Sequence, residues 1–269
     1  MKYLESAIKF SIKNWMLILP LFVLTALASL LGGVGRSSMD YGKLFSTFGS
    51  MNNFSSPGNM MSTLPGLFSS MAVGGGILAI LVQFVSIPAT YGLVNKSLDT
   101  GNASLNDIGA AVTGNFIKYV MYFIGMVVLG LAIGIGSSIL MLILGLLTSL
   151  INILGVLLVI VGLALFIACI ILAVLLSMWL SAMIVDGLDV VAAAKKSIEI
   201  VKGCFWTVLG ITILVFIAVT IAGFILGLLS RIPLLGPIIY SAVPTAQTFI
   251  MIVFLLTLYR ERTGKVNTL

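Results

Sequence analysis

The sequence contains no histidine, which removes the commonest general base and the commonest metal ligand. Its two cysteines, Cys169 and Cys204, fit no metal or redox spacing, and no disulfide is expected between a membrane span and a cytoplasmic interface. No P-loop, HExxH motif or nucleophile–base pair is present. Asp186 and Asp189 could share a metal, although capping of a helix is the better interpretation. These absences predict that the protein is not an enzyme and has no catalytic residues, no cofactor and no metal.

Charged side chains are also scarce. Charged residues make up 8% of the 269 residues, whereas a soluble domain carries about 25%. Hydrophobic residues make up 60% of the chain. Several apolar runs reach the roughly 20 residues that cross a bilayer. The net charge is +6, but its placement follows the positive-inside rule, so no nucleic-acid partner is expected. The sequence therefore predicts an all-α, polytopic membrane protein.

Six spans are expected, with both termini in the cytoplasm. The charge-free stretch 119–185 has room for two long spans or three short ones. Two spans keep the N-terminal and later lysines on one side of the membrane, so two are preferred. Of the 14 Lys and Arg residues, only Arg36, Lys43 and Arg231 then fall outside. The expected spans are 16–34, 73–94, 119–147, 155–183, 205–229 and 238–258.

An amphipathic segment precedes every second span, at 3–15, 95–116 and 189–203. Each ends at a junction where Gly or Asn lets the backbone turn and an aromatic residue lies at headgroup depth. The junctions are Lys13-Asn14-Trp15, Gly114-Asn115-Phe116 and Gly203-Cys204-Phe205, and Pro88 and Pro244 recur in the second spans of the first and third units. We expect one membrane domain, 1–269, of three parallel hairpin repeats, 1–94, 95–185 and 186–269, each preceded by a cytoplasmic interfacial helix. Convergence of these short matches is the alternative.

The interfacial segments carry the residues expected to contact lipid headgroups. Anionic headgroups attract lysines near the surface by about 1 kcal/mol each, and tryptophan anchors at the interface. The candidates are Lys9, Lys13, Trp15, Lys195, Lys196, Lys202 and Trp206. A long non-cytoplasmic loop, 36–72, is expected to be either a connector lying against lipid or, less favoured, a lid.

A polar seam between hairpins is a second candidate site, formed by Gln83, Thr90, Thr245 and Gln247. Hydrogen bonding between helices, at roughly 0.6 kcal/mol per contact, is the favoured interpretation. The alternative is a path for headgroups or small solutes. No acidic residue is expected in mid-membrane, which argues against a proton-coupled transporter.

Two stretches carry a family resemblance. Residues 190–214 read VVAAAKKSIEIVKGCFWTVLGITIL, and the chain closes its last span with Leu-Tyr-Arg-Glu-Arg at 258–262. Both resemble the glycerophosphoryl diester phosphodiesterase membrane domain and related six-span bacterial and archaeal proteins. The resemblance implies a six-span domain in the plasma membrane of a prokaryote. The catalytic barrel of some relatives uses histidine, so that activity is not implied here.

Together these features favour a non-enzymatic integral membrane module that engages lipid. It would be an accessory to lipid or envelope processes, or a facilitator of lipid movement. The alternative is a small-solute channel or exporter that uses the polar seam. Membrane lipids are the expected partners, together with protein partners or further copies of the chain.

Overall fold

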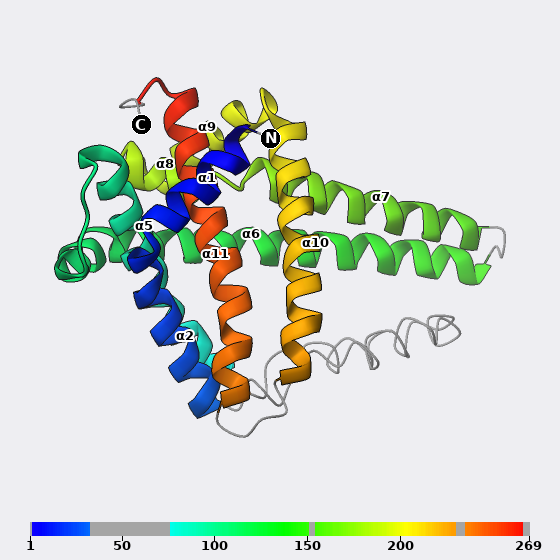
Figure 1. Ribbon diagram of the computed structural model, residues 1–269. Coiled ribbons are helices and arrows are strands. Elements are labelled where there is room, and N and C mark those ends of the chain that lie inside the picture. The colour runs from blue at the N-terminus through cyan, green and yellow to red at the C-terminus, as the bar shows by residue number, and fades with distance from the viewer. Residues whose placement is uncertain (1, 33–75, 151–153, 230–234, 266–269) are drawn as a thin grey trace. The chain divides into compact units, whose positions relative to one another are not determined.

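The computed structural model describes residues 2–32, 76–150, 154–229 and 235–265 (Figure 1). The expected loop 36–72 lies outside these ranges. Within them the regular elements are all helical, which confirms the all-α class. In chain order they are α1 (Lys2–Lys13), η1 (Trp15–Ile18), α2 (Leu19–Gly32), α5 (Gly76–Thr100), η3 (Leu105–Asp107), α6 (Ile108–Leu150), α7 (Leu154–Leu175), α8 (Trp179–Val185), α9 (Val190–Lys202), α10 (Phe205–Leu229) and α11 (Leu235–Arg262).

Several of these helices are long and apolar enough to cross a membrane. In the described ranges the candidates are Leu105–Leu147, Val159–Val185, Phe205–Gly227 and Ile238–Arg262, with Tyr3–Lys13 and Trp15–Leu30 as a fifth if that bent pair is one span. The chain is therefore an α-helical, multi-pass membrane protein. Six spans are not shown in the described ranges, where α5, which overlaps the expected span 73–94, is not among the candidates.

The chain forms two compact units. Unit 1 comprises Met1–Ser37, Gly74–Tyr122 and Val174–Leu269. Its centre is α11, which packs against α1, α2, α5, α8 and α10, and Figure 1 shows it flanked by α2 and α10. Within the most apolar window of α11, 44% of the residues are buried, against 17% for α10. The protein-packed core of unit 1 therefore runs along α11.

Unit 2 comprises Ser38–Val73 and Phe123–Ala173, and its described part is a helical hairpin. A Cβ built on Gly162 of α7 would lie 2.9 Å from the Cε of Met141, so α6 and α7 pack closely there. No residue in the most apolar stretch of α6 is buried. A helix that is apolar on all sides and not covered by its own chain is suited to lipid.

The prediction of a second junction at Gly114-Asn115-Phe116 is wrong. Helix α6 runs through it without a break and absorbs part of the amphipathic segment expected at 95–116. The amide of Asn115 donates to the Ala111 carbonyl at 2.9 Å, so its side chain is satisfied within the helix. The first part of that segment continues α5 as far as Thr100, where Gly101 ends the helix at a φ of 74°. The described elements therefore do not reproduce the threefold layout.

The expected span 155–183 is also interrupted. Helix α7 ends at Leu175 and α8 begins at Trp179. Ser197 of α9 bridges the break: its hydroxyl donates to the Leu175 carbonyl at 2.7 Å and accepts from the Met178 amide at 3.2 Å. No proline or glycine lies at 176–178, so no local sequence pattern marks this break. By contrast, α10 has the bounds expected for its span, 205–229.

Candidate functional site

The first candidate region is the N-terminal junction, where α1 meets η1 and α2 at an angle of 88°. The turn is held by Asn14, whose backbone and side-chain amides both donate to the Phe10 carbonyl, at 2.9 and 3.1 Å. Ala7 and Phe10 are the buried residues of α1, which packs against α11. Lys9, Lys13 and Trp15 are left exposed, Trp15 by 56%.

The second region is the α9–α10 junction at 203–206. Asp189 caps α9 by accepting a hydrogen bond from the Ala192 amide at 3.2 Å, as the sequence predicts. Ala193, Ser197 and Val201 form the buried face of α9, which packs against α8. The lysines Lys195, Lys196 and Lys202 lie on the other faces: Lys195 and Lys202 are exposed, whereas Lys196 is half-buried and pairs with Glu199 at 3.2 Å. Trp206, at the start of α10, is 80% exposed.

Contacts to the end of α11 bring these two regions to the same end of unit 1. The Tyr3 hydroxyl of α1 donates to Glu261 at 3.2 Å. Asp186, which ends α8 just before α9, accepts a hydrogen bond from Lys265 at 2.6 Å. The start of α6 reaches the same region, because the Lys118 ammonium donates to the Ile184 carbonyl at 3.4 Å. The seven residues expected to contact lipid headgroups therefore belong to one end of one unit.

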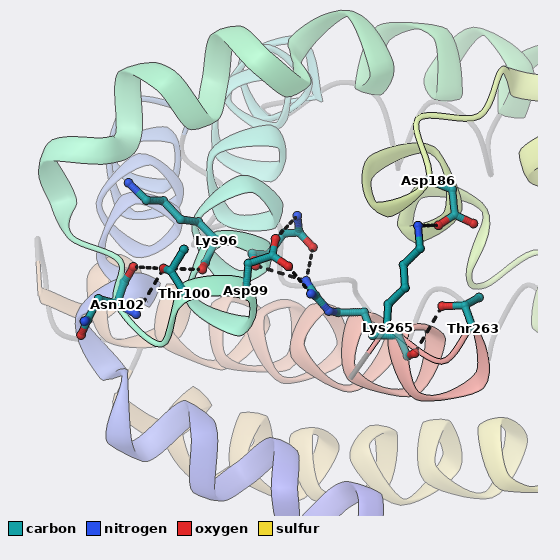
Figure 2. Close-up of polar contacts among 9 residues, drawn as sticks. Lys96, Asp99, Thr100, Asn102, Asp186, Thr263 and Lys265 are labelled. Atoms are coloured by element: carbon teal, nitrogen blue, oxygen red, sulfur yellow. Dashed lines mark hydrogen bonds and ion pairs between the residues drawn. The ribbon is translucent and has the colours of Figure 1, made fainter. Parts of the chain in front are cut away.

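The C-terminal turn of α11 positions Lys265. Gly264 has a φ of 71°, and the Lys265 amide donates back to the Arg260 carbonyl at 2.9 Å. This left-handed glycine cap reverses the chain, and Figure 2 shows the Lys265 side chain extending to Asp186. The Tyr259 hydroxyl donates to the other carboxylate oxygen of Asp186 at 2.6 Å. Partial burial raises the pKa of Asp186, but the hydrogen bonds from Lys265 and Tyr259 outweigh it and lower the pKa overall.

A second polar cluster joins α11 to the end of α5 (Figure 2). Arg260, only 6% exposed, donates to the side-chain oxygen of Asn95 at 2.9 Å and forms an ion pair with Asp99. Nearby, Lys96 pairs with Asp107 at 2.7 Å. A buried guanidinium needs such partners, because an unpaired buried charge is costly. Both clusters have a structural explanation, since they fasten α5 and α8 to the end of α11.

Of these two clusters the sequence singles out Asp186, as a metal or capping candidate, and it predicts none of the pairings. Tyr259 and Arg260 carry part of the family resemblance, and Asn95 and Asp99 fall in the amphipathic segment expected at 95–116. Asp99 and Asn95 lie 161 and 165 residues from Arg260 in the chain, and no local pattern marks a pairing at that distance. A glycine two residues after the last arginine of the final helix is the one local sign of the C-terminal turn.

The polar seam is not assembled by hydrogen bonds in the part of the chain that the structure describes. Thr90 and Thr245 are buried, and each donates to a carbonyl one turn back in its own helix, Ser86 and Ser241, at 2.7 Å. Gln83 is exposed and Gln247 is half-buried. No hydrogen bond between described residues joins any two of these four side chains. The sequence prediction of a path along them stays a prediction.

An apolar groove opens beside the N-terminal junction. It has a volume of about 400 Å³ and lies between α1–η1 and α11. The lining from α1 and η1 includes Ile8, Ile12, Trp15 and Ile18, and that from α11 is Ala246, Phe249 and Ile250. Its single hydroxyl, that of Ser11, donates to the Ala7 carbonyl at 2.7 Å. Apart from the indole N–H of Trp15, the lining side chains therefore present hydrocarbon or a hydroxyl that is already bonded.

The acidic residues and cysteines also have to be considered as metal ligands. Among the described residues, no three of the Cys, Asp and Glu side chains are grouped so that they could hold an ion. Asp189 caps α9 and Asp186 binds Lys265 and Tyr259, so each has a structural partner. Cys169 is exposed, Cys204 is buried, and both are free thiols.

Comparison with known proteins gives a family and no function. The family model described as "Domain of unknown function (DUF7847)" matches residues 16–259, so the chain belongs to that family. No curated protein and no solved structure matches the chain. The resemblance to the glycerophosphoryl diester phosphodiesterase membrane domain stays a prediction.

Proposed function

We propose that this member of the DUF7847 family is a non-enzymatic membrane module that engages anionic lipid at one end of unit 1. The observation that carries the proposal is the exposure of Trp15 and Trp206, 56% and 80%. Each tryptophan begins an apolar helix directly after an amphipathic helix with exposed lysines. Large exposed indole rings at such positions are typical of the headgroup level of a bilayer.

The charges near these tryptophans favour anionic over neutral headgroups. Lys13, Lys195 and Lys202 are exposed, and none of them has an ion-pair partner among the described residues. Lys9 and Lys196 are partly neutralised by Glu5 and Glu199, at 2.7 and 3.2 Å. Exposed pairs of this kind are worth little and exchange readily for other anions. All five lysines therefore contribute to the proposed lipid contact, the three unpaired ones most.

A topology with both termini in the cytoplasm, in the plasma membrane of a prokaryote, belongs to the same proposal. The contacts from Tyr3 to Glu261 and from Lys265 to Asp186 support it, because they hold the start of α1 and the turn after α11 at one end of unit 1. Six spans follow if α2 and α5 cross as the first pair. Their packing on each other, and that of α10 on α11, support a hairpin arrangement.

The test is the lipid that remains bound to the full chain. The protein is extracted from vesicles of equal phosphatidylglycerol and phosphatidylcholine, and the co-purified lipid is quantified. We expect enrichment of phosphatidylglycerol, and its loss when Lys9, Lys13, Lys195, Lys196 and Lys202 are all changed to glutamine. The matched variant with arginine at the same positions keeps the charge and should keep the enrichment. Equal amounts of the two lipids in the wild type would remove the proposal.

Reconstitution separates the forms that the function can take. Vesicles carry a fluorescent lipid in one leaflet and, separately, a trapped small dye. Movement of lipid with retention of dye supports a facilitator of lipid movement. Retention of both supports an accessory role with a protein partner or a further copy of the chain. Leakage of dye would instead favour the channel or exporter with Gln83, Thr90, Thr245 and Gln247 along its path.

A further inference from the structure

The apolar groove between α1–η1 and α11 has the size and chemistry of a ligand site. Its volume of about 400 Å³ lies in the lower part of the roughly 300–1,000 Å³ of small-molecule pockets. Its lining is apolar, and the Ser11 hydroxyl is already bonded within α1. A polar solute would lose its hydration there and would find only the Trp15 indole N–H as a free side-chain donor, which is costly. The occupant must therefore be a hydrocarbon where it meets the groove.

The position of Lys13 indicates what the hydrocarbon is attached to. Lys13 is exposed and stands in the chain between Ile12 and Trp15, which both line the groove. Lys9 is paired with Glu5 at 2.7 Å, whereas no acidic side chain of the described residues pairs with Lys13. None of the lining residues is acidic. In the chain, two residues of the groove therefore flank an unpaired cation, and the lining carries no negative charge.

We infer that this groove binds one acyl chain of an anionic phospholipid, with the phosphate-bearing headgroup at Lys13. The inference deepens the proposed function and rests on it, because it needs α1 to lie at headgroup depth. It goes beyond the proposed function because it assigns one specifically bound lipid to a defined groove, in addition to the lipid that surrounds the protein. Trp15 would then contact the bound lipid at the level where its chain meets its headgroup.

The experiment uses the full chain in phosphatidylcholine vesicles that contain a trace of phosphatidylglycerol with a photoreactive diazirine in its acyl chain. After illumination, adducts are located by mass spectrometry of peptides. We expect a higher yield on 8–18 and 246–250 than on the exposed face of α10 around Phe216 and Phe224. The same diazirine on phosphatidylcholine should show no such preference.

Two pairs of variants make the result specific. Lys13→Gln should lower the phosphatidylglycerol yield at the groove about fivefold, the factor corresponding to about 1 kcal/mol, and Lys13→Arg should retain it. Ala246→Phe fills the groove and should abolish the preference. The matched Ala218→Phe adds the same ring on an exposed position of α10 and should leave the preference unchanged.

Equal labelling of the groove and of α10 by both lipids would overturn the inference. If phosphatidylglycerol still co-purifies in excess in that case, the proposed function stands and the groove alone is wrong. If the excess is absent as well, both fail. Labelling of the groove that depends on Lys13 and Ala246, without a general excess of anionic lipid, would support the groove and restrict the proposed function to that one bound lipid.

Discussion

The helix α11 of unit 1 and the hairpin of unit 2 show two ways of building a membrane helix. Of the four candidate spans, α11 is the least hydrophobic and the most buried, whereas the α6 candidate has no buried residue in its most apolar window. A span covered by protein can carry polar groups such as Ser241, Thr245 and Arg260, since neighbouring atoms satisfy them. A span that faces lipid instead keeps polar groups that its own helix satisfies, such as the Ser137 hydroxyl of α6, which donates to the Gly134 carbonyl at 3.0 Å. In this chain the candidate span with the lowest mean hydropathy, α11, is therefore the one at the packed centre of unit 1.

The largest expected effect comes from removing a buried ring of α11. Phe254 is fully buried, and Phe254→Ala should lower the free energy of unfolding by an amount at the low end of roughly 3–5 kcal/mol. The low end applies because detergent, like lipid, remains apolar around the unfolded helices. Phe166→Ala in unit 2, where the ring is 63% exposed, should stay within about 0.5 kcal/mol. Unfolding in mixed micelles measures both, and equal losses would contradict the comparison.

Next is Arg260, the buried cation of the same helix. Arg260→Met removes its hydrogen bond to Asn95 and its ion pair with Asp99, and should cost about 1.5–3 kcal/mol. Arg262 lies two residues on and is exposed, so Arg262→Met is the matched control, with a change below about 0.5 kcal/mol. The same unfolding assay applies. Similar values for the two arginines would show that the α5–α11 cluster is not stabilising.

A pair of glycines gives the third comparison. A Cβ on Gly92 of α5 would lie 2.7 Å from both the Ala111 Cβ and the Asn115 Nδ2, and a Cβ on Gly134 of unit 2 meets nothing within 4 Å. Gly92→Ala should therefore cost about 1–3 kcal/mol through overpacking. Gly134→Ala should be neutral, or stabilising by up to about 1 kcal/mol, because alanine is the better helix former. The thermal midpoint of each variant tests this, and a neutral Gly92→Ala would contradict the close packing of α5 on α6.

The smallest effect concerns acid. The pKa of Asp186 is lower in the folded protein than its ordinary value, so its ionised form stabilises the fold above an unfolded-state pKa of about 4. This contribution is lost as the pH falls below that value and through the folded pKa. Asp186→Asn should therefore be less stable at neutral pH and lose less stability on acidification. An unfolding series from neutral to acidic pH tests this, and parallel curves for the two proteins would contradict it.

Local signals in the sequence predicted part of this architecture well. The bounds of α10, the Asp189 cap and the turn at Asn14 each follow from neighbouring residues. The same reasoning failed at Gly114, where glycine and asparagine are present but nothing forces the helix to turn. A junction residue permits a bend, and tertiary contacts decide whether one forms.

The remaining features depend on residues far apart in the chain. The break between α7 and α8 is held by Ser197, from a different helix, and the groove arises where α1 meets α11. Neither the break nor the groove is marked by a sequence pattern in the helices that form it. The lysines and tryptophans of the candidate site were readable from composition and spacing, but their gathering at one end of unit 1 depends on the side chains of Tyr3, Lys118 and Lys265.

The central claim is that anionic lipid meets this protein at the lysine-rich end of unit 1, and a residue-resolved headgroup map tests it most directly. The full chain is reconstituted with an anionic phospholipid whose photoreactive group is on the headgroup, and the adducts are sequenced. The account predicts adducts concentrated on α1 and around 195–206, with few on the hairpin at 123–173. Adducts spread evenly over both, or equal labelling by a neutral lipid with the same group, would contradict it.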